Sequence, residues 1–280
     1  MKVYIQSNRY QLIAANVAKY SFERFGCKVN IMDAEKNELL KKSFNKNIIR
    51  NKKTITYKDD LQSFTLLRFL APQLDNYKNK ILVIDPDIFA LKNPKDLYDK
   101  FVNETINIVC TYYGESPRSE MMMINANKVS WKFEKIVEDL FNLQLDYSDL
   151  MKLKFDNSLV INKIENKYNS HDKLDENTVL LHTTSRITQP WKIGLNVDFE
   201  RHYTKKYLIK ENIKRLMSMK YNYDALSKKY IMHKNKLVFE TICKLFKEAY
   251  KSNYITKEML NLSIDNNYIS KEFCEMAEII

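Results

Sequence analysis

The chain has 280 residues and a formal net charge of +11, and 45% of its residues are hydrophobic. A chain of this length and apolar content can bury a large core, which excludes wholesale disorder. It contains only three glycines (Gly26, Gly114 and Gly194), where average usage would give roughly 20. Because these glycines lie far apart, the sequence excludes both a G-x-G-x-x-G dinucleotide loop and a Walker A phosphate loop.

The cysteines and the apolar stretches indicate the compartment. Four cysteines are present, none of them in a C-x-x-C pair: Cys27, Cys110, Cys243 and Cys274. This spacing predicts buried, reduced thiols and disfavours a zinc knuckle. No signal-peptide pattern is visible, and the longest nearly apolar stretch, 81–91, is far too short to span a bilayer. We therefore expect a cytoplasmic protein.

Strand-like and helix-like patterns alternate over the first 200 residues, which is typical of an α/β architecture. Strands are expected at 3–6, 28–32, 80–84, 106–111 and 120–124, with weaker candidates at 159–161 and 178–181. Helices are expected at 13–25, closing at Gly26, at 61–70, ending before Pro72, at 95–101, and after Asn125 and Asn127. Residues 34–59 read as a long polar excursion. Segment 80–84 is apolar without alternation, as in a strand that is buried on both faces.

Beyond about residue 203 the pattern becomes helical, with segments near 205–218, 235–250 and 269–278. We therefore divide the chain into an α/β domain, 1–200, and a basic helical extension, 201–280. Residues 201–251 hold 14 Lys and Arg against 4 Asp and Glu, a surplus of +10. A basic amphipathic helix suits peripheral contact with an anionic membrane, and we expect that contact on the inner face of the membrane. The alternative is that its apolar side packs onto the α/β domain while the lysines are only solvated.

Two carboxylates follow the apolar strand 80–84. Asp85 and Asp87 flank Pro86, and residues two apart in extended chain project to the same side. Such a pair can converge on one hard cation and leave coordination positions free, which suits Mn²⁺ or Mg²⁺ shared with a substrate diphosphate. The alternative is a polar turn that leaves a strand.

A histidine ends a second apolar run. His182 follows segment 178–181 and leads into a polar, basic loop that contains Trp191, one of two tryptophans. Its neutral imidazole could be a third metal ligand. The alternative is a core or capping histidine.

Together these windows resemble the GT-A fold glycosyltransferases, specifically family 8, which includes glycogenin and bacterial galactosyltransferases. The resemblance spans roughly residues 2–200. It is carried by Arg68 on the expected helix, by Asp85-Pro86-Asp87 with the continuation Leu91, Pro94, Leu97 and Tyr98, and by the late loop His182…Pro190-Trp191-Lys192. It implies a Rossmann-like, nucleotide-sugar-binding mixed sheet flanked by helices. It also implies a retaining hexosyltransferase that uses a UDP-sugar donor and a glycan or lipid-linked acceptor.

The resemblance also implies roles for individual residues. Asp85, Asp87 and His182 would bind the divalent metal, and Arg68 would contact the donor. The loop after the first strand would bind the nucleoside through Gln6, Ser7, Asn8 and Tyr10. Gln189 stands where the family has a phosphate-binding lysine, so Arg186 or Lys192 would supply that charge. Asp149 and Asp156 are the candidates for the acid beside the reacting sugar.

Two other classes of function stay open. A nucleotidyltransferase or another phosphoryl-transfer enzyme also needs paired carboxylates, although it would usually show a glycine-rich loop near the N-terminus. A non-catalytic protein that binds an anionic surface through residues 201–251 would leave the carboxylate pair without a use. Specific nucleic-acid recognition is not expected, because only 8 of the 46 basic residues are arginine.

Overall fold

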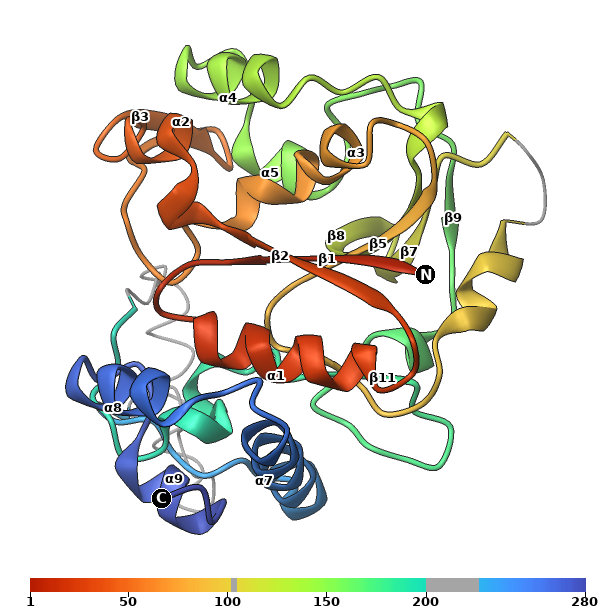
Figure 1. Cartoon of the computed structure of the whole chain (residues 1–280). Coiled ribbons are helices and arrows are strands. Elements are labelled where there is room, and N and C mark those ends of the chain that lie inside the picture. The colour runs from red at the N-terminus through yellow and green to blue at the C-terminus, as the bar shows by residue number, and fades with distance from the viewer. Residues whose placement is uncertain (102–104, 200–226) are drawn as a thin grey trace, which may run out of the picture.

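The structure, a computed structural model, describes residues 1–101, 105–199 and 227–280. A six-stranded mixed sheet forms its centre, in the order β2-β1-β5-β8-β7-β9. Its strands are β1 (Lys2–Ser7), β2 (Lys28–Asp33), β5 (Lys80–Ile84), β7 (Ile108–Tyr113), β8 (Ser116–Asn125) and β9 (Ile161–Lys163). β1 runs parallel to β2 and β5, whereas β8 runs antiparallel to both β5 and β7. Helices cover both faces of the sheet (Figure 1). The expected α/β fold class is therefore confirmed.

The central strands are buried on both faces. In β5, Leu82 and Ile84 belong to one hydrophobic core, and Ile81 and Val83 belong to the other. Such a strand has no polar face, which explains why its sequence is apolar without alternation. The strand ends only where the first carboxylate, Asp85, is reached.

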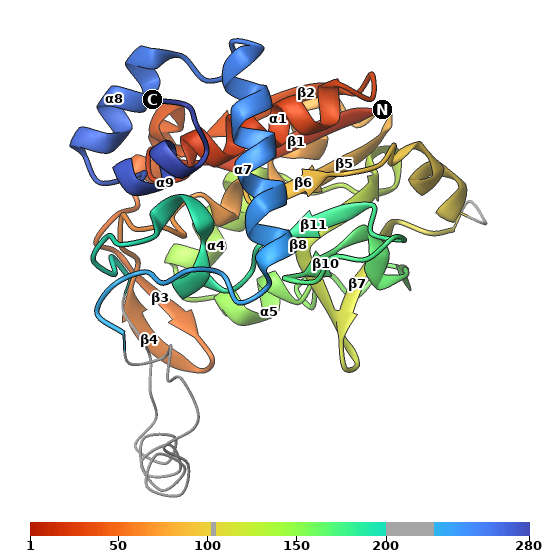
Figure 2. The same ribbon diagram turned by 90° about the horizontal axis from the view of Figure 1, so that it is seen from below.

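The first core lies between the sheet, a smaller sheet and four helices. The helices are α1 (Leu12–Glu23), α7 (Lys236–Lys251), α8 (Lys257–Asp265) and α9 (Lys271–Met276), and the smaller sheet has β10 (Ser170–His171), β11 (Leu180–His182) and β6 (Ile88–Ala90). α7 crosses α1 in Figure 2, and Glu248 binds Arg24 there at 3.2 Å. Gly26, with φ of +73°, reverses the chain after α1, a backbone conformation that favours glycine.

The second core lies under shorter elements. They are α2 (Glu38–Lys41), the hairpin β3 (Asn47–Arg50) and β4 (Lys53–Thr56), α3 (Ala71–Leu74), α4 (Phe133–Phe141) and α5 (Tyr147–Met151). The excursion expected at 34–59 thus contains α2 and the hairpin. The tip of the hairpin is tied to α5, because Asp146 accepts hydrogen bonds from the amides of Asn51 at 3.1 Å and Lys52 at 2.7 Å.

Most expected elements are present, with shifted ends. The helix expected at 61–70 is wrong: this segment forms turns and a 3-10 helix, Thr65–Phe69. The segment at 95–101 is likewise a 3-10 helix, Lys95–Lys100. Pro72 lies in the first turn of α3, where its missing N–H costs no hydrogen bond. α8 was not expected.

The C-terminal helices contribute to the same core as β1. Val238, Phe246 and Phe273 are fully buried in the first core together with Val3 and Ile5. The helix expected at 205–218 lies outside the described residues, so its basic amphipathic face stays a prediction, as does a domain boundary near residue 200. Among the described residues, the apolar helices are all too short to cross a membrane. All four cysteines are free thiols, three of them buried.

Candidate functional site

Strand pairing brings the predicted carboxylates and histidine together. The chain leaves the large sheet at Asp85, the first residue after β5, and enters the small sheet at β6, directly after Asp87. β6 pairs antiparallel with β11, so that Ile88 lies opposite His182. The amide of Thr183 also donates to the carbonyl of Asp87 at 3.1 Å. His182 is therefore held beside Asp87 by backbone register, although the two are 95 positions apart in the sequence.

One ligand atom each from Asp85, Asp87 and His182 lies within 4.8 Å of the other two. The Nε2 atom of His182 is 3.3 Å from Oδ1 of Asp87. The three side chains are 15%, 14% and 5% exposed, so they are shielded from bulk water yet open toward a cleft. Two carboxylates and one imidazole are a donor set that suits a divalent cation.

The orientation of His182 follows from its partner Asn169. The amide nitrogen of Asn169 donates to Thr111 at 2.9 Å and to Glu120 at 3.2 Å. Its amide oxygen is therefore an acceptor, 2.8 Å from Nδ1 of His182, which must carry the proton. Nε2 is left facing Asp87, where it either holds a second proton or offers a lone pair.

The charges around His182 favour its protonated form. Burial lowers the pKa of His182, but the carboxylates of Asp87, Glu120 and Asp85 outweigh that effect and raise the pKa to about 9. In the absence of a metal, an imidazolium at neutral pH thus partly neutralises the carboxylates. A cation that takes Nε2 of His182 as a ligand must displace the proton on that atom.

Asp85 is held from the other side by Arg68. The guanidinium of Arg68 donates to both carboxylate oxygens, at 2.6 Å and 2.7 Å from Nη2, and Gln6 donates to Oδ1 as well. Burial raises the pKa of Asp85 to about 6, against the lowering effect of Arg68. Arg68 itself is buried and also donates to Ser119 at 2.9 Å. It therefore orients Asp85, a role that the sequence did not reveal.

Glu120 and His171 adjoin this group and were missed. Glu120, on β8, lies 2.8 Å from Nε2 of His171, and the two form a second group of close ligand atoms with His182. Burial raises the pKa of Glu120, but His171, His182 and Arg68 more than offset it and lower the pKa to about 2. Glu120 occupies an ordinary strand position, so no motif marks it.

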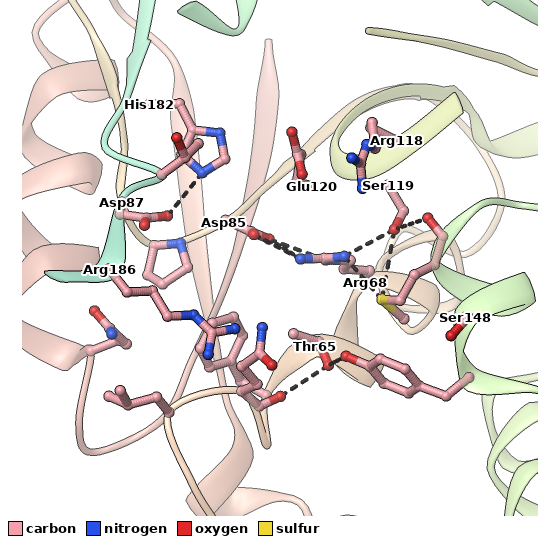
Figure 3. A pocket seen from close by; sticks show the side chains of 18 of the residues that line it. Thr65, Arg68, Asp85, Asp87, Arg118, Ser119, Glu120, Ser148, His182 and Arg186 are labelled. Carbon is pink, nitrogen blue, oxygen red and sulfur yellow. Dashed lines mark hydrogen bonds and ion pairs between the residues drawn. The ribbon is translucent and has the colours of Figure 1, made fainter. Parts of the chain in front are cut away.

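One cleft of about 330 Å³ is lined by Arg68, Asp85, Asp87, Glu120 and His182. Figure 3 shows Asp87 and His182 on one side of it, Arg118 and Ser119 on the other, and the Arg68–Asp85 pair between them. Among the described residues, basic side chains outnumber acids in the cleft lining: they are Arg50, Arg68, Arg118, Lys152 and Arg186. Its acids are Asp85, Asp87 and Glu120.

The residues expected to bind the nucleoside occupy different places. Gln6 is buried and holds Asp85, and Ser7 is buried with its hydroxyl on the carbonyl of Asn8. Asn8 is also buried, and it donates to the carbonyl of Asp60 at 2.7 Å and to Ser63 at 3.0 Å. Tyr10 packs edge-to-face on Tyr268 and lines a separate cavity. The structure thus brings Gln6 to the cleft residues but leaves Ser7, Asn8 and Tyr10 outside the cleft lining.

Arg186 and Lys192 differ in their surroundings. Arg186 lines the cleft near His182. Lys192 is fully buried, and its ammonium binds Asp198 at 2.6 Å. Burial lowers the pKa of Lys192 against the effect of Asp198. Of the two, only Arg186 is free to meet a ligand in the cleft.

Asp149 and Asp156 lie outside the cleft lining. Asp149 is exposed on α5, while its neighbours Tyr147 and Ser148 face the cleft. Asp156 accepts hydrogen bonds from Nε1 of Trp131 at 3.2 Å and from Ser158, and so stabilises a turn. The cleft acid nearest the candidate metal ligands in the same network is Glu120.

Comparison with known proteins gives structural similarity alone. No family model matches the sequence, and no curated protein matches it. The galactosyltransferase LgtC, in complex with donor and acceptor sugar analogues, is similar with a TM-score of 0.48 and 12% identity, over 80% of this chain and 98% of that one. The bifunctional glycosyltransferase WbbM has a TM-score of 0.48 and 13% identity, over 78% and 52%. GlyE of Streptococcus pneumoniae has a TM-score of 0.45 and 17% identity, over 77% and 63%.

Proposed function

We propose that the protein is a metal-dependent glycosyltransferase, which moves a sugar from a nucleoside diphosphate donor to an acceptor hydroxyl. The observation that carries this proposal is the convergence of Asp85, Asp87 and His182 at the end of a buried strand, inside a cleft with basic walls. The sequence resemblance adds a UDP-sugar donor, a glycan or lipid-linked acceptor and retention of configuration.

The donor set fits Mn²⁺ or Mg²⁺. Asp85, Asp87 and His182 would hold the ion, and Arg68 would keep the Asp85 carboxylate in place through its three hydrogen bonds. Carboxylates are hard ligands that leave room for phosphate oxygens, and one imidazole favours Mn²⁺ over Mg²⁺. When bound, such an ion neutralises the charge that grows on the departing diphosphate.

Basic side chains support the same leaving group. Arg186 lines the cleft four residues after His182, and its guanidinium offers several N–H donors in one plane. Such donors, held beside the leaving group, stabilise the negative charge of a leaving diphosphate. We assign Arg186 to the donor phosphates, in place of Lys192, whose ammonium is engaged by Asp198.

The reacting sugar becomes cationic as the diphosphate leaves. The lowered pKa of Glu120, about 2, keeps this carboxylate ionised at neutral pH, and it lies in the same cleft as the candidate ligands. We assign it the role of stabilising that positive charge. Asp149 and Asp156 are less suited to this role because neither lines the cleft.

Calorimetric titration with UDP, in the presence and absence of Mn²⁺, tests the proposal directly. We expect UDP to bind with Mn²⁺ and to bind at least tenfold more weakly with excess EDTA. Asp87→Asn should abolish the metal effect, whereas Asp149→Asn, a matched change outside the cleft, should keep it.

A screen of nucleotide sugars for donor hydrolysis then identifies the donor. Absence of UDP and GDP binding under every metal condition would contradict the proposal. Release of pyrophosphate from nucleoside triphosphates would instead indicate a nucleotidyltransferase.

A further inference from the structure

The described arginines fall into two groups. Arg9, Arg24 and Arg68 each bind a carboxylate, at 2.5 to 3.2 Å. Arg50, Arg118 and Arg186 have no carboxylate partner among residues 1–101, 105–199 and 227–280, and all three line the cleft. A guanidinium stays charged at every physiological pH, so unpaired guanidiniums in a cleft favour an anionic ligand.

Each of the three unpaired guanidiniums lies over an aromatic ring. Arg50 lies over Tyr147 at 5.1 Å, and Arg186 lies over Phe199 at 5.5 Å. Arg118 lies over Tyr113 at 4.9 Å. When an aromatic ring contacts the face of a guanidinium, the N–H groups at its edge stay available. They can then bind a phosphate or carboxylate through two parallel hydrogen bonds.

A second cavity, of about 460 Å³, adjoins the cleft. Arg50, Arg186 and Tyr147 line both spaces and therefore lie at the passage between them. The second cavity is also lined by apolar and aromatic residues, among them Ile48, Ile55, Tyr57 and Phe199. The metal-ligand candidates line only the first space, so the second has room for a different molecule.

Arg50 is fixed at this passage. It ends β3, and the hairpin tip that follows is tied to the Asp146 carboxylate. Asp146 is also the N-cap of α5, whose first residue is Tyr147. The hairpin and α5 are thereby locked together, and Arg50 is held over the ring of Tyr147 before any ligand binds.

The charges of the second cavity leave a positive excess. Its acids are Asp60 and Asp198, and Asp198 is already neutralised by Lys192. Of its cationic residues, Lys58 already has an interaction of its own, whereas Arg50 and Arg186 have no carboxylate partner among the described residues. If Arg186 serves the donor diphosphate, Arg50 is left to meet a second anionic group.

We propose that the acceptor itself is anionic, and that Arg50 binds its phosphate or carboxylate group in the second cavity. This inference rests on the proposed function only in identifying the ligand as the acceptor. The anion site itself is defined by Arg50 and the second cavity. It makes Arg50 a specificity-determining residue, separate from the residues that hold the metal and the donor.

Binding of three sugar probes tests the site without turnover. The three probes differ in one substituent. Glucose 6-phosphate carries a phosphate monoester, glucuronate carries a carboxylate, and glucose carries no charged group. They are titrated into the full chain in EDTA, so that no metal is involved. We expect the two anions, or one of them, to bind at least tenfold more tightly than glucose. Arg50→Gln should remove that preference.

Lys53→Gln is the matched control. It removes one positive charge from the same hairpin, where Lys53 on β4 lies opposite Arg50 on β3. Lys53 lines neither cavity. It should change the affinity for the anions by less than twofold, while circular dichroism confirms that both variants fold.

The outcomes separate the two proposals. Preference for the phosphate alone, for the carboxylate alone or for both supports the anion site and names its group. Equal binding of glucose and the anions, or equal affinity in wild type and Arg50→Gln, overturns it. Binding of UDP with Mn²⁺, measured on the same samples, reports on the proposed function independently.

Discussion

One wall of the cleft, the strand-built wall, is made from the ends of β5, β6 and β11, and the opposite wall combines β8 with the β3–β4 hairpin and α5. Asp85, Asp87 and His182 stand where β5, β6 and β11 begin or end, so backbone register places them. Arg50 and Ser148 stand on a hairpin and on the five-residue helix α5, which side-chain hydrogen bonds to Asp146 hold together. The candidate metal ligands are thus placed by strand pairing, whereas Arg50 is placed by side-chain hydrogen bonds that join a hairpin to a short helix.

Asp87→Asn is expected to have the largest effect. The variant removes one charged ligand atom from the strand-built wall but keeps its size. A loss of several kcal/mol of leaving-group stabilisation corresponds to a fall of about 1,000-fold or more in sugar transfer. The measurement is the turnover rate with saturating Mn²⁺, alongside the melting temperature, which should change little. Full turnover by this variant would remove Asp87 from the metal site.

Arg68→Met tests how strongly the strand-built wall depends on its buried ion pair. The change leaves the buried Asp85 carboxylate without its partner, which should lower the free energy of unfolding by about 3–5 kcal/mol. Urea denaturation measures this loss. The double variant Arg68→Met/Asp85→Asn removes both charges and should regain most of the stability. If it is no more stable than Arg68→Met alone, the pair is not the cause.

The pH dependence of metal binding should report on His182. Its pKa of about 9 lies above neutral pH, so a cation must displace a proton from Nε2. Apparent Mn²⁺ affinity should therefore rise about tenfold per pH unit as the pH increases from 6.5 to 8.5, and level off above 9. Below about pH 6, protonation of Asp85 should steepen the fall in affinity. Electron paramagnetic resonance of free Mn²⁺ gives the affinity at each pH.

His182→Gln and His171→Gln sharpen that measurement. The first should remove the tenfold slope between pH 6.5 and 8.5, because no ring proton is then displaced. The second changes the exposed neighbour on β10 and should preserve the slope. A wild-type affinity that does not change with pH would show that His182 is not a ligand.

The smallest effects are expected at the two acids outside the cleft. Asp156→Ala should lower the free energy of unfolding by about 1–2 kcal/mol, because it leaves the Trp131 N–H without its acceptor. Turnover should stay within about twofold. Asp149→Ala should alter neither quantity, since Asp149 is exposed on α5. A hundredfold loss of turnover in either variant would contradict the placement of that acid outside the cleft.

The strand-built wall was also the part that the sequence could predict. An apolar run followed by Asp85 and Asp87 marks a strand end, and His182 marks another, because strand burial leaves a direct trace in composition. The meeting of these ends depends on the pairing of β6 with β11, which no local pattern encodes. Glu120 was missed because a single acid within a strand is an ordinary surface residue in sequence.

Side-chain partners were predicted poorly. Lys192 has the charge expected of a phosphate ligand, but Asp198 neutralises it in the interior. The 61–70 segment has apolar residues at helical spacing. However, the side chain of Asn8 donates a hydrogen bond to the carbonyl of Asp60, and the hydroxyl of Tyr57 donates one to the carbonyl of Ser63. Those carbonyls are acceptors that the first helical turns would use, so the long-range hydrogen bonds compete with an α-helix, and the segment forms i→i+3 bonds such as that from Ser63 to Asp60. Such competition between local and distant partners is invisible in a local pattern.

The packing of Trp191 gives the molecule a late step in its own assembly. This ring, in the loop that follows His182, stacks on Phe246 of α7, and the Trp191 carbonyl accepts the amide of Ser270 at α9. The first strand, β1, lies in the same core as these helices. During synthesis, β1 and α1 must therefore wait for more than two hundred further residues before their apolar faces are covered. Contacts of such long range slow folding and leave the apolar surface of a nascent chain exposed until the C-terminal helices have been made.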